Sequence, residues 1–295
     1  MIASVLGVLG LALAGPVPAL LAHSRWLLPV PRAGVLLWQS LALAASLAIV
    51  GSGVLVASAL GLHADAPVRT AAAVVVLTLT AIILGRLLWS TGRVALDTRV
   101  RRRRHRHLVD LLGGRSGDQP HLRILEESAP MAYCLPALGN HRLVVSAGAL
   151  ACLDEPGLSA VLAHERAHVR ARHDLVIEGF AALQMAFPRG VSSEVPLHQA
   201  QLMVEMLADD AARARVGAAP LARALVSLAG QRIPTSGLGA ADRCVVVRLE
   251  RLASPVRPRR VRAALAYAGA ALVLVAPTVF VAVPWLVDVW QRLGA

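Results

Sequence analysis

The chain has 295 residues, of which 56% are hydrophobic and only 16% are charged, a composition that is too apolar for a soluble protein of this length. Its net charge of +12 raises the question of nucleic-acid binding, but much of that excess lies in two basic runs, at 99–107 and 257–262, which border apolar stretches. Basic residues beside a membrane span set its orientation and attract anionic head groups, so we expect membrane lipid, and no direct nucleic acid, as their partner.

Four apolar runs are long enough to cross the roughly 30 Å hydrocarbon core of a bilayer. They predict transmembrane helices at about 2–22, 33–62, 70–89 and 263–287, so that residues 1–90 hold three spans and 288–295 form a short external tail. The first run lacks the leading Lys or Arg of a signal peptide and is interpreted as a retained span.

The orientation of these spans follows from the positive-inside rule. The rule requires the first loop and both basic runs to lie on the cytoplasmic side, and alternating crossings permit this. Both termini are then outside, and the domain at 91–262 is in the cytoplasm. The cysteines agree with a reducing compartment, because they are odd in number, widely spaced and confined to this domain, at Cys134, Cys152 and Cys244.

Within 91–262, the pattern changes from strand to helix. β-branched runs at 121–128 and 131–150, with a Gly139-Asn140 turn signal, predict two or three short strands that include a hairpin. Further along, helical patterns predict helices at 221–231 and 241–253. We therefore expect a mostly helical α+β domain with a short antiparallel sheet.

Two longer helices lie between these segments. The first is predicted as one uninterrupted helix over 158–187, capped by Asp154 or Glu155 and stopped by Pro188. The second runs from about 197 to 216 and ends at Gly217, the usual position for a C-terminal glycine.

The first of these helices carries the sequence HERAH, from His164 to His168. Residues four apart stand on one face of a helix, so the two imidazoles reach the same point, with Glu165 beside them. Catalytic zinc takes three protein ligands and leaves a position to water, whose proton Glu165 is placed to accept. The alternative is a solvated surface helix, which the apolar segment before His164 disfavours.

The second helix offers a third ligand. Glu205 is followed four residues later by Asp209 on the same face. Glu205 can complete a zinc site, while Asp209 can accept the second ring N–H of a ligand histidine and fix its tautomer. An ordinary exposed glutamate is the alternative for Glu205.

This arrangement resembles the BlaR/MecR-type membrane metallopeptidases: a HERAH helix and an ExxxD helix lie between three N-terminal spans and one C-terminal span, and the segments 131–150 and 158–175 are typical of that family. The resemblance implies a gluzincin-like domain in a multi-pass protein of the bacterial plasma membrane, with one Zn²⁺ per chain. By motif position, His164, His168 and Glu205 bind zinc, and Glu165 is the general base.

The resemblance also implies a substrate and its binding strand. In that family the edge of the hairpin is where a substrate strand adds, which makes a substrate platform of Met131, Ala132, Tyr133, Cys134 and Leu135. The substrate it implies is a cytoplasmic protein such as a transcriptional repressor. BlaR/MecR receptors also carry a penicillin-binding sensor domain after the last span, and the residues after 287 are too few for one, so we expect no direct β-lactam sensing.

The group that stabilises the oxyanion is left open. His173, His198 and Arg213 are candidates by charge. His173 is nine residues from His164 and would face the opposite side of an ideal helix.

These patterns favour a membrane-embedded zinc-dependent endopeptidase that cleaves a cytoplasmic protein or peptide. One alternative is a housekeeping peptidase for membrane-protein maturation or quality control. Another is a non-catalytic membrane receptor or scaffold, although structural zinc is normally closed by four ligands and the sequence offers three and a base.

Overall fold

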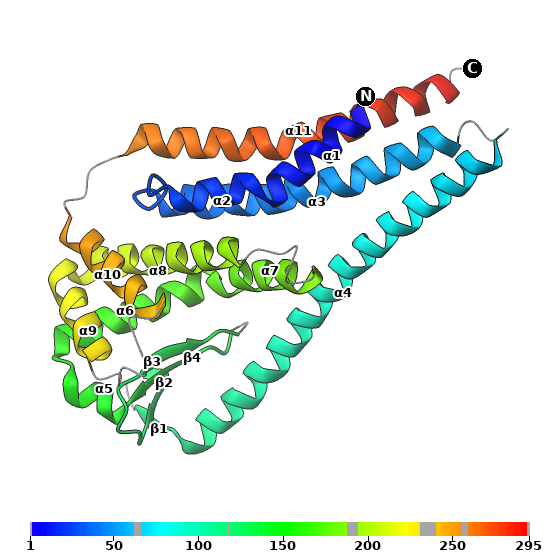
Figure 1. Ribbon diagram of the computed structural model, residues 1–295. Helices are drawn as coiled ribbons and strands as arrows, with labels where there is room; N and C mark the ends of the chain where they lie inside the picture. The colour runs from blue at the N-terminus through cyan, green and yellow to red at the C-terminus, as the bar shows by residue number, and fades with distance from the viewer. Residues whose placement is uncertain are drawn as a thin grey trace. The chain divides into compact units, whose positions relative to one another are not determined.

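A computed structural model describes residues 2–61, 66–116, 119–137, 139–187, 194–230, 240–254 and 259–293. It divides into two compact units (Figure 1). Unit 1 comprises residues 1–93, 179–200 and 259–295, and unit 2 comprises residues 94–178 and 201–258. Pro188, the predicted end of the first long helix, lies outside the described residues.

Unit 1 is helical. It includes α1 (Ile2–Ala14), α2 (Pro16–His23), α3 (Pro31–Gly61), the first half of α4 (Pro67–Leu112) and α11 (Arg260–Leu293), besides helical residues within 179–200. Among the described residues, four stretches are long and apolar enough to cross a membrane: Ile2–His23, Pro31–Gly61, Pro67–Leu112 and Arg260–Phe280. Each overlaps one of the four predicted spans, and their apolar character supports membrane association.

Small residues bring the helices of unit 1 close together. At Gly10 of α1, an added Cβ would lie 2.7 Å from Ile49 Cγ1 of α3. At Gly53 of α3, it would lie 2.0 Å from Thr80 Oγ1 of α4. Glycine removes the side chain that would separate two backbones, as is common where helices pack in a bilayer.

The third apolar helix does not end where the basic run begins. α4 is continuous for 46 residues, about 70 Å at 1.5 Å per residue, and Figure 1 shows it as one uninterrupted helix. Its apolar first half belongs to unit 1 and its basic second half, from residue 94, to unit 2. One helix therefore contributes residues to both units.

Unit 2 contains a sheet of four described strands: β1 (Gly114–Ser116), β2 (Gln119–Leu125), β3 (Ala132–Leu135) and β4 (Arg142–Ser146). The predicted hairpin is confirmed, because β3 pairs antiparallel with β4 and Gly139 between them has a φ of +74°. The prediction of a wholly antiparallel sheet is wrong. The strand order is β1-β2-β4-β3, and β4, whose direction the hairpin reverses, pairs parallel with β2.

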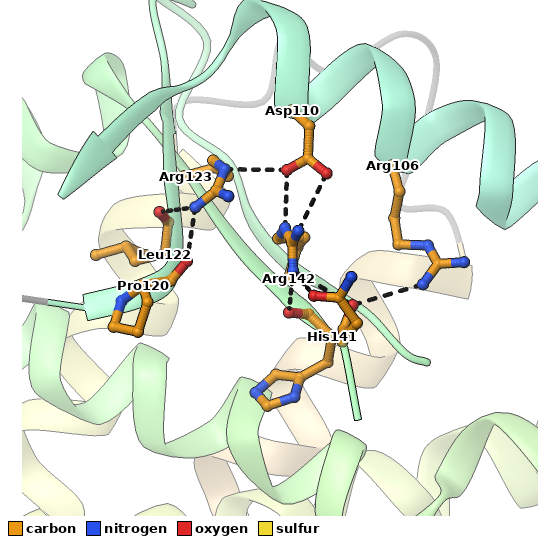
Figure 2. Close-up of polar contacts among 8 residues, drawn as sticks. Arg106, Asp110, Pro120, Leu122, Arg123, His141 and Arg142 are labelled. Carbon is orange, nitrogen blue, oxygen red and sulfur yellow. Dashed lines mark hydrogen bonds and ion pairs between the residues drawn. The ribbon is translucent and has the colours of Figure 1, made fainter. Parts of the chain in front are cut away.

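The sheet is covered on both faces, which is why β4 is buried along its whole length. Leu143 and Val145 pack with Leu162 of α6 (Glu155–Ala171), while Val144 packs with Val109 at the end of α4. On the α4 side, Asp110 accepts hydrogen bonds from Arg123 and Arg142, two strand arginines that are otherwise buried (Figure 2). These ion pairs attach the end of α4 to the sheet.

Four more helices follow α6 in unit 2 or enter it: α7 (His173–Ala186), α8 (Val195–Val216), α9 (Ala218–Gly230) and α10 (Ala240–Ala253); the short α5 (Ala147–Cys152) precedes α6. α8 ends before Gly217, as predicted. The prediction of one helix over 158–187 is wrong, because the helix is interrupted at Arg172. That residue has a φ of 52°, the left-handed conformation that ends a helix, so α7 starts a new axis.

Candidate active site

The HERAH segment lies in the middle of α6. The helix begins where Asp154 accepts the backbone N–H of Gly157 at 2.8 Å, which confirms Asp154 as the cap. A stripe of alanine at positions 160, 163 and 167 packs into the core and leaves room for α8 to approach. His164 is buried on this side of the helix, so its imidazole faces protein rather than solvent.

α8 supplies the carboxylates that meet these histidines. Glu205 Oε2 lies 3.3 Å from His164 Nε2, and Glu205 Oε1 lies 3.4 Å from His168 Nε2. One turn along α8, Asp209 Oδ1 lies 3.0 Å from His164 Nδ1. The structure therefore brings together the four residues that the spacing had assigned to one centre, and places Asp209 on the far ring nitrogen of His164 as expected.

The geometry of this cluster fits a metal ion. His164, His168 and Glu205 each offer a ligand atom within 4.8 Å of the others, and the two Nε2 atoms are 3.2 Å apart. Two ligand atoms held at about 2.05 Å by a tetrahedral zinc ion lie about 3.3 Å from each other. The 3.2 Å between the two Nε2 atoms is close to that value, and Glu205 approaches them with its two oxygens, Oε2 at 3.3 Å from His164 and Oε1 at 3.4 Å from His168.

Arg248 of α10 completes the centre, and sequence reasoning missed it. Its guanidinium donates to both oxygens of Asp209, at 2.7 and 2.6 Å, and lies 2.8 Å from Glu205 Oε2. Arg248 is buried, so these contacts are sheltered from water. Arg248 binds Oε2 of Glu205, and the other oxygen, Oε1, faces His168.

His173 was expected on the opposite side of the helix from His164, and this expectation is wrong. Because the chain turns at Arg172, the first residue of α7 folds back beside α6. His173 Nδ1 lies 3.1 Å from His168 Nδ1, and the two rings meet edge to face. None of the three oxyanion candidates is among the residues that line the cavity described below: Arg213 donates to the carbonyl of Ser254 at 3.4 Å, and His198 is exposed in unit 1.

Charges within the centre separate the two histidines. Burial alone lowers the pKa of His164, but the nearby carboxylates of Asp209 and Glu205 outweigh it and raise this pKa to about 9. Burial lowers the pKa of His168 to about 4 in spite of the attraction of Glu205. Burial would raise the pKa of Glu205, yet His164 and Arg248 outweigh it and lower this pKa to about 2. Glu205 is therefore ionised at neutral pH, as a metal ligand must be.

Glu165 faces a different environment from the carboxylate ligand. Burial raises its pKa, against the attraction of His164, which brings the carboxylate nearer to the range of an effective general base. Its carboxylate lies close enough to Cys134 on β3 that each group shifts the pKa of the other. The proposed base is therefore seated against the proposed substrate platform.

The platform is an edge strand. The carbonyl of Met131 accepts the N–H of Ser146 at 3.0 Å, so the backbone groups of Tyr133 point to β4 while those of Ala132 and Cys134 point to the free edge. Beside this edge lies a cavity of about 240 Å³ bounded by Ala132, the centre and Arg248. Its remaining wall is apolar and comes from Val161, Leu221, Leu225, Leu228, Ala229 and Val245.

Comparison with known families agrees with this geometry. Residues 96–236 match the model of peptidase family M48, a zinc metallopeptidase family. The matched segment contains β1 to β4, α6 and α8, with both histidines and both carboxylates of the centre, and it supports protease activity; Arg248 lies beyond it. No curated protein and no solved structure gave a match.

Proposed function

We propose that this chain is a membrane-embedded zinc-dependent endopeptidase, with His164, His168 and Glu205 as the zinc ligands. The observation that carries the proposal is the convergence of these three ligand atoms beside Glu165, at a cavity that borders a free strand edge. Three ligands and an adjacent carboxylate are what a catalytic zinc site needs, whereas a structural site is normally closed by four ligands.

A zinc ion held there would lower the pKa of water and polarise the scissile carbonyl. Glu165 accepts a proton from the attacking water and delivers it to the leaving amine nitrogen. Its raised pKa suits the first step, because a more basic carboxylate takes the proton more readily. Asp209 orients the His164 ring through its Nδ1 atom. Arg248 contacts both Asp209 and Glu205 and fixes the position of the two carboxylates. Arg248 is also the cationic side chain that the cavity offers to a developing oxyanion.

The substrate is a peptide in extended conformation that adds to β3. The outward N–H and C=O groups of Ala132 and Cys134 can form backbone hydrogen bonds with such a strand. These bonds hold the substrate backbone, and the substrate side chains determine specificity. The apolar wall of the cavity favours a hydrophobic side chain next to the scissile bond.

The four apolar helices support an orientation in the bacterial plasma membrane with both termini outside and unit 2 in the cytoplasm, because the basic half of α4 directly follows its apolar half. In this orientation the exposed arginines Arg101, Arg103 and Arg104 of α4 are available to anionic lipid head groups. The substrate is then a cytoplasmic protein, and a transcriptional repressor is the specific case that the likeness to BlaR/MecR-type enzymes favours.

The test is zinc content and cleavage for the detergent-purified full chain. We expect about one zinc per chain in the wild type and its loss in His164→Ala and Glu205→Ala. Glu165→Gln should keep zinc and lose peptide cleavage, while the exposed Glu250→Gln serves as the matched control and should keep both. Zinc that survives Glu205→Ala would reject Glu205 as a ligand, and a wild type without zinc would reject the proposal.

The regulatory role has its own test. Cytoplasmic and membrane proteins are compared between cells that carry the wild type and cells that carry Glu165→Gln. One accumulating protein supports a signalling peptidase, and many accumulating membrane proteins support a quality-control enzyme instead.

A further inference from the structure

The two histidines of the HERAH segment are held from their far ring nitrogens by different partners. Asp209 lies 3.0 Å from Nδ1 of His164, whereas His168 meets a second imidazole, with His173 Nδ1 at 3.1 Å from its own Nδ1. His173 is buried, so water does not compete for this contact. His168, a proposed zinc ligand, is therefore paired with a histidine, whereas His164 is paired with a carboxylate.

We propose that His173 is the positioning residue of His168: its Nδ1 accepts the Nδ1–H of His168, which leaves the Nε2 lone pair of His168 directed at the metal. This inference rests on the proposed zinc site. The arrangement agrees with it, because Nε2 of His168 is the atom that lies near His164 Nε2 and Glu205 Oε1. Histidines that bind a metal through one nitrogen almost always donate from the other, and that donor sets the tautomer and the ring plane.

The chain around His173 is built to hold it in this place. Arg172 adopts a left-handed conformation that is uncommon for a residue with a side chain, and its N–H binds the carbonyls of His168 and Val169. Arg172 Nε then donates to Asp174 at 3.2 Å. These contacts fold the first turn of α7 back onto the end of α6.

A second clamp comes from α4. Arg102 lies 2.9 Å from Asp174 Oδ2 and 2.6 Å from Glu178 Oε1, so it binds two carboxylates one turn apart on α7. Asp174 is the direct neighbour of His173, and its side chain is only 7% exposed. The helix that continues the third apolar span therefore fixes the segment that carries His173, and Arg102 acts on His168 through that segment.

The experiment measures zinc affinity of the full chain in detergent by competition with a chelator. His173→Leu removes the acceptor, and we expect zinc to bind about 10 to 100 times more weakly. His173→Asn keeps an acceptor oxygen near the position of Nδ1, and we expect it to restore most of the affinity. Arg102→Gln, which releases the clamp, should weaken zinc binding less than His173→Leu does.

Two further readouts separate positioning from general loss of structure. Thermal unfolding of the metal-free chain reports whether each variant folds, and the visible absorption of bound Co²⁺ reports the geometry at the ligands. We expect His173→Leu to change the Co²⁺ spectrum while His173→Asn resembles the wild type. If His173→Leu does not fold, the Arg102→Gln variant alone decides the matter through its affinity and its spectrum.

Some outcomes would overturn the inference. Zinc affinity and Co²⁺ spectrum unchanged in His173→Leu would do so, as would equal losses in the Leu and Asn variants. In both cases the wild type still binds zinc, so the proposed function stands. If the wild type itself binds no zinc, it is the proposed function that fails.

Discussion

Arg248 of α10 binds Asp209 of α8 through two parallel contacts, with Nε to Oδ2 at 2.7 Å and Nη2 to Oδ1 at 2.6 Å. Asp209 lies 3.0 Å from Nδ1 of His164, so Arg248, 39 positions after Asp209 in the sequence, supports a proposed zinc ligand through Asp209. Because both members of the pair are buried, the loss of one leaves the other without compensation.

The first prediction concerns the shape of this contact. Arg248→Lys keeps the charge but loses the planar fork, so Asp209 and Glu205 are no longer held together. We expect zinc affinity to fall about tenfold or more, with a parallel loss of kcat/KM. Arg251→Lys is the matched control, because Arg251 makes a similar fork to Asp210 at a more exposed site. Equal effects of the two substitutions would reject a special role for Arg248.

The second prediction concerns the junction of α4 and the sheet. Asp110 is the carboxylate that Arg123 and Arg142 share, and Asp110→Asn removes its charge from two buried guanidinium groups (Figure 2). Because Asp110 itself is partly exposed, we expect the free energy of unfolding to drop by about 1–2 kcal/mol. Chemical denaturation followed by circular dichroism measures it. The exposed Glu126→Gln should leave stability unchanged, and an Asp110→Asn chain as stable as that control would contradict the prediction.

The third prediction concerns the thiol of Cys134 on the edge strand. Burial raises its pKa, and the charge of Glu165 raises it further, so the thiol stays protonated at pH 8. Since the thiolate is the reactive form, alkylation of the folded chain should be slow at pH 8 and faster at higher pH. Removing the negative charge in Glu165→Gln lowers the pKa and should speed the reaction. Mass spectrometry in a Cys152→Ser, Cys244→Ser background reads the rate, and fast alkylation of the folded chain at pH 8 would refute the prediction.

The fourth prediction concerns the packing of α3 on α4 within unit 1. In Gly53→Ala the new Cβ would lie 2.0 Å from Thr80 Oγ1, so the helices must separate or Thr80 must move. We expect a lower thermal unfolding midpoint in detergent, and partial recovery when Thr80→Ala is added. Gly85→Ala on α4 is the control, because nothing lies within 4 Å of its added Cβ. Because alanine favours the helix more than glycine does, Gly85→Ala should not lower the midpoint, and an equal fall in both single variants would contradict the packing explanation.

The elements that carry the centre could be predicted because their signals are local. Any helix over HERAH places its two imidazoles on one face, because they are four residues apart. Glu205 and Asp209 have the same four-residue spacing on α8. The apolar spans and the hairpin at Gly139 rest on composition and turn chemistry, which also act over a few residues. Each of these signals is carried by residues close together in the sequence.

Only the tertiary structure decided the positions of Arg248, His173 and β4. Arg248 is one arginine among many, and no spacing relates it to carboxylates on another helix. The assumption of an ideal helix put His173 on the wrong side, because the left-handed turn at Arg172 is stabilised by Asp174 and by the clamp from Arg102, 70 residues earlier. The insertion of β4 between β2 and β3 depends likewise on which strand buries both faces. Local patterns fix which face a side chain occupies along its own element, but which elements meet is set by the burial and charge pairing of residues distant in the sequence.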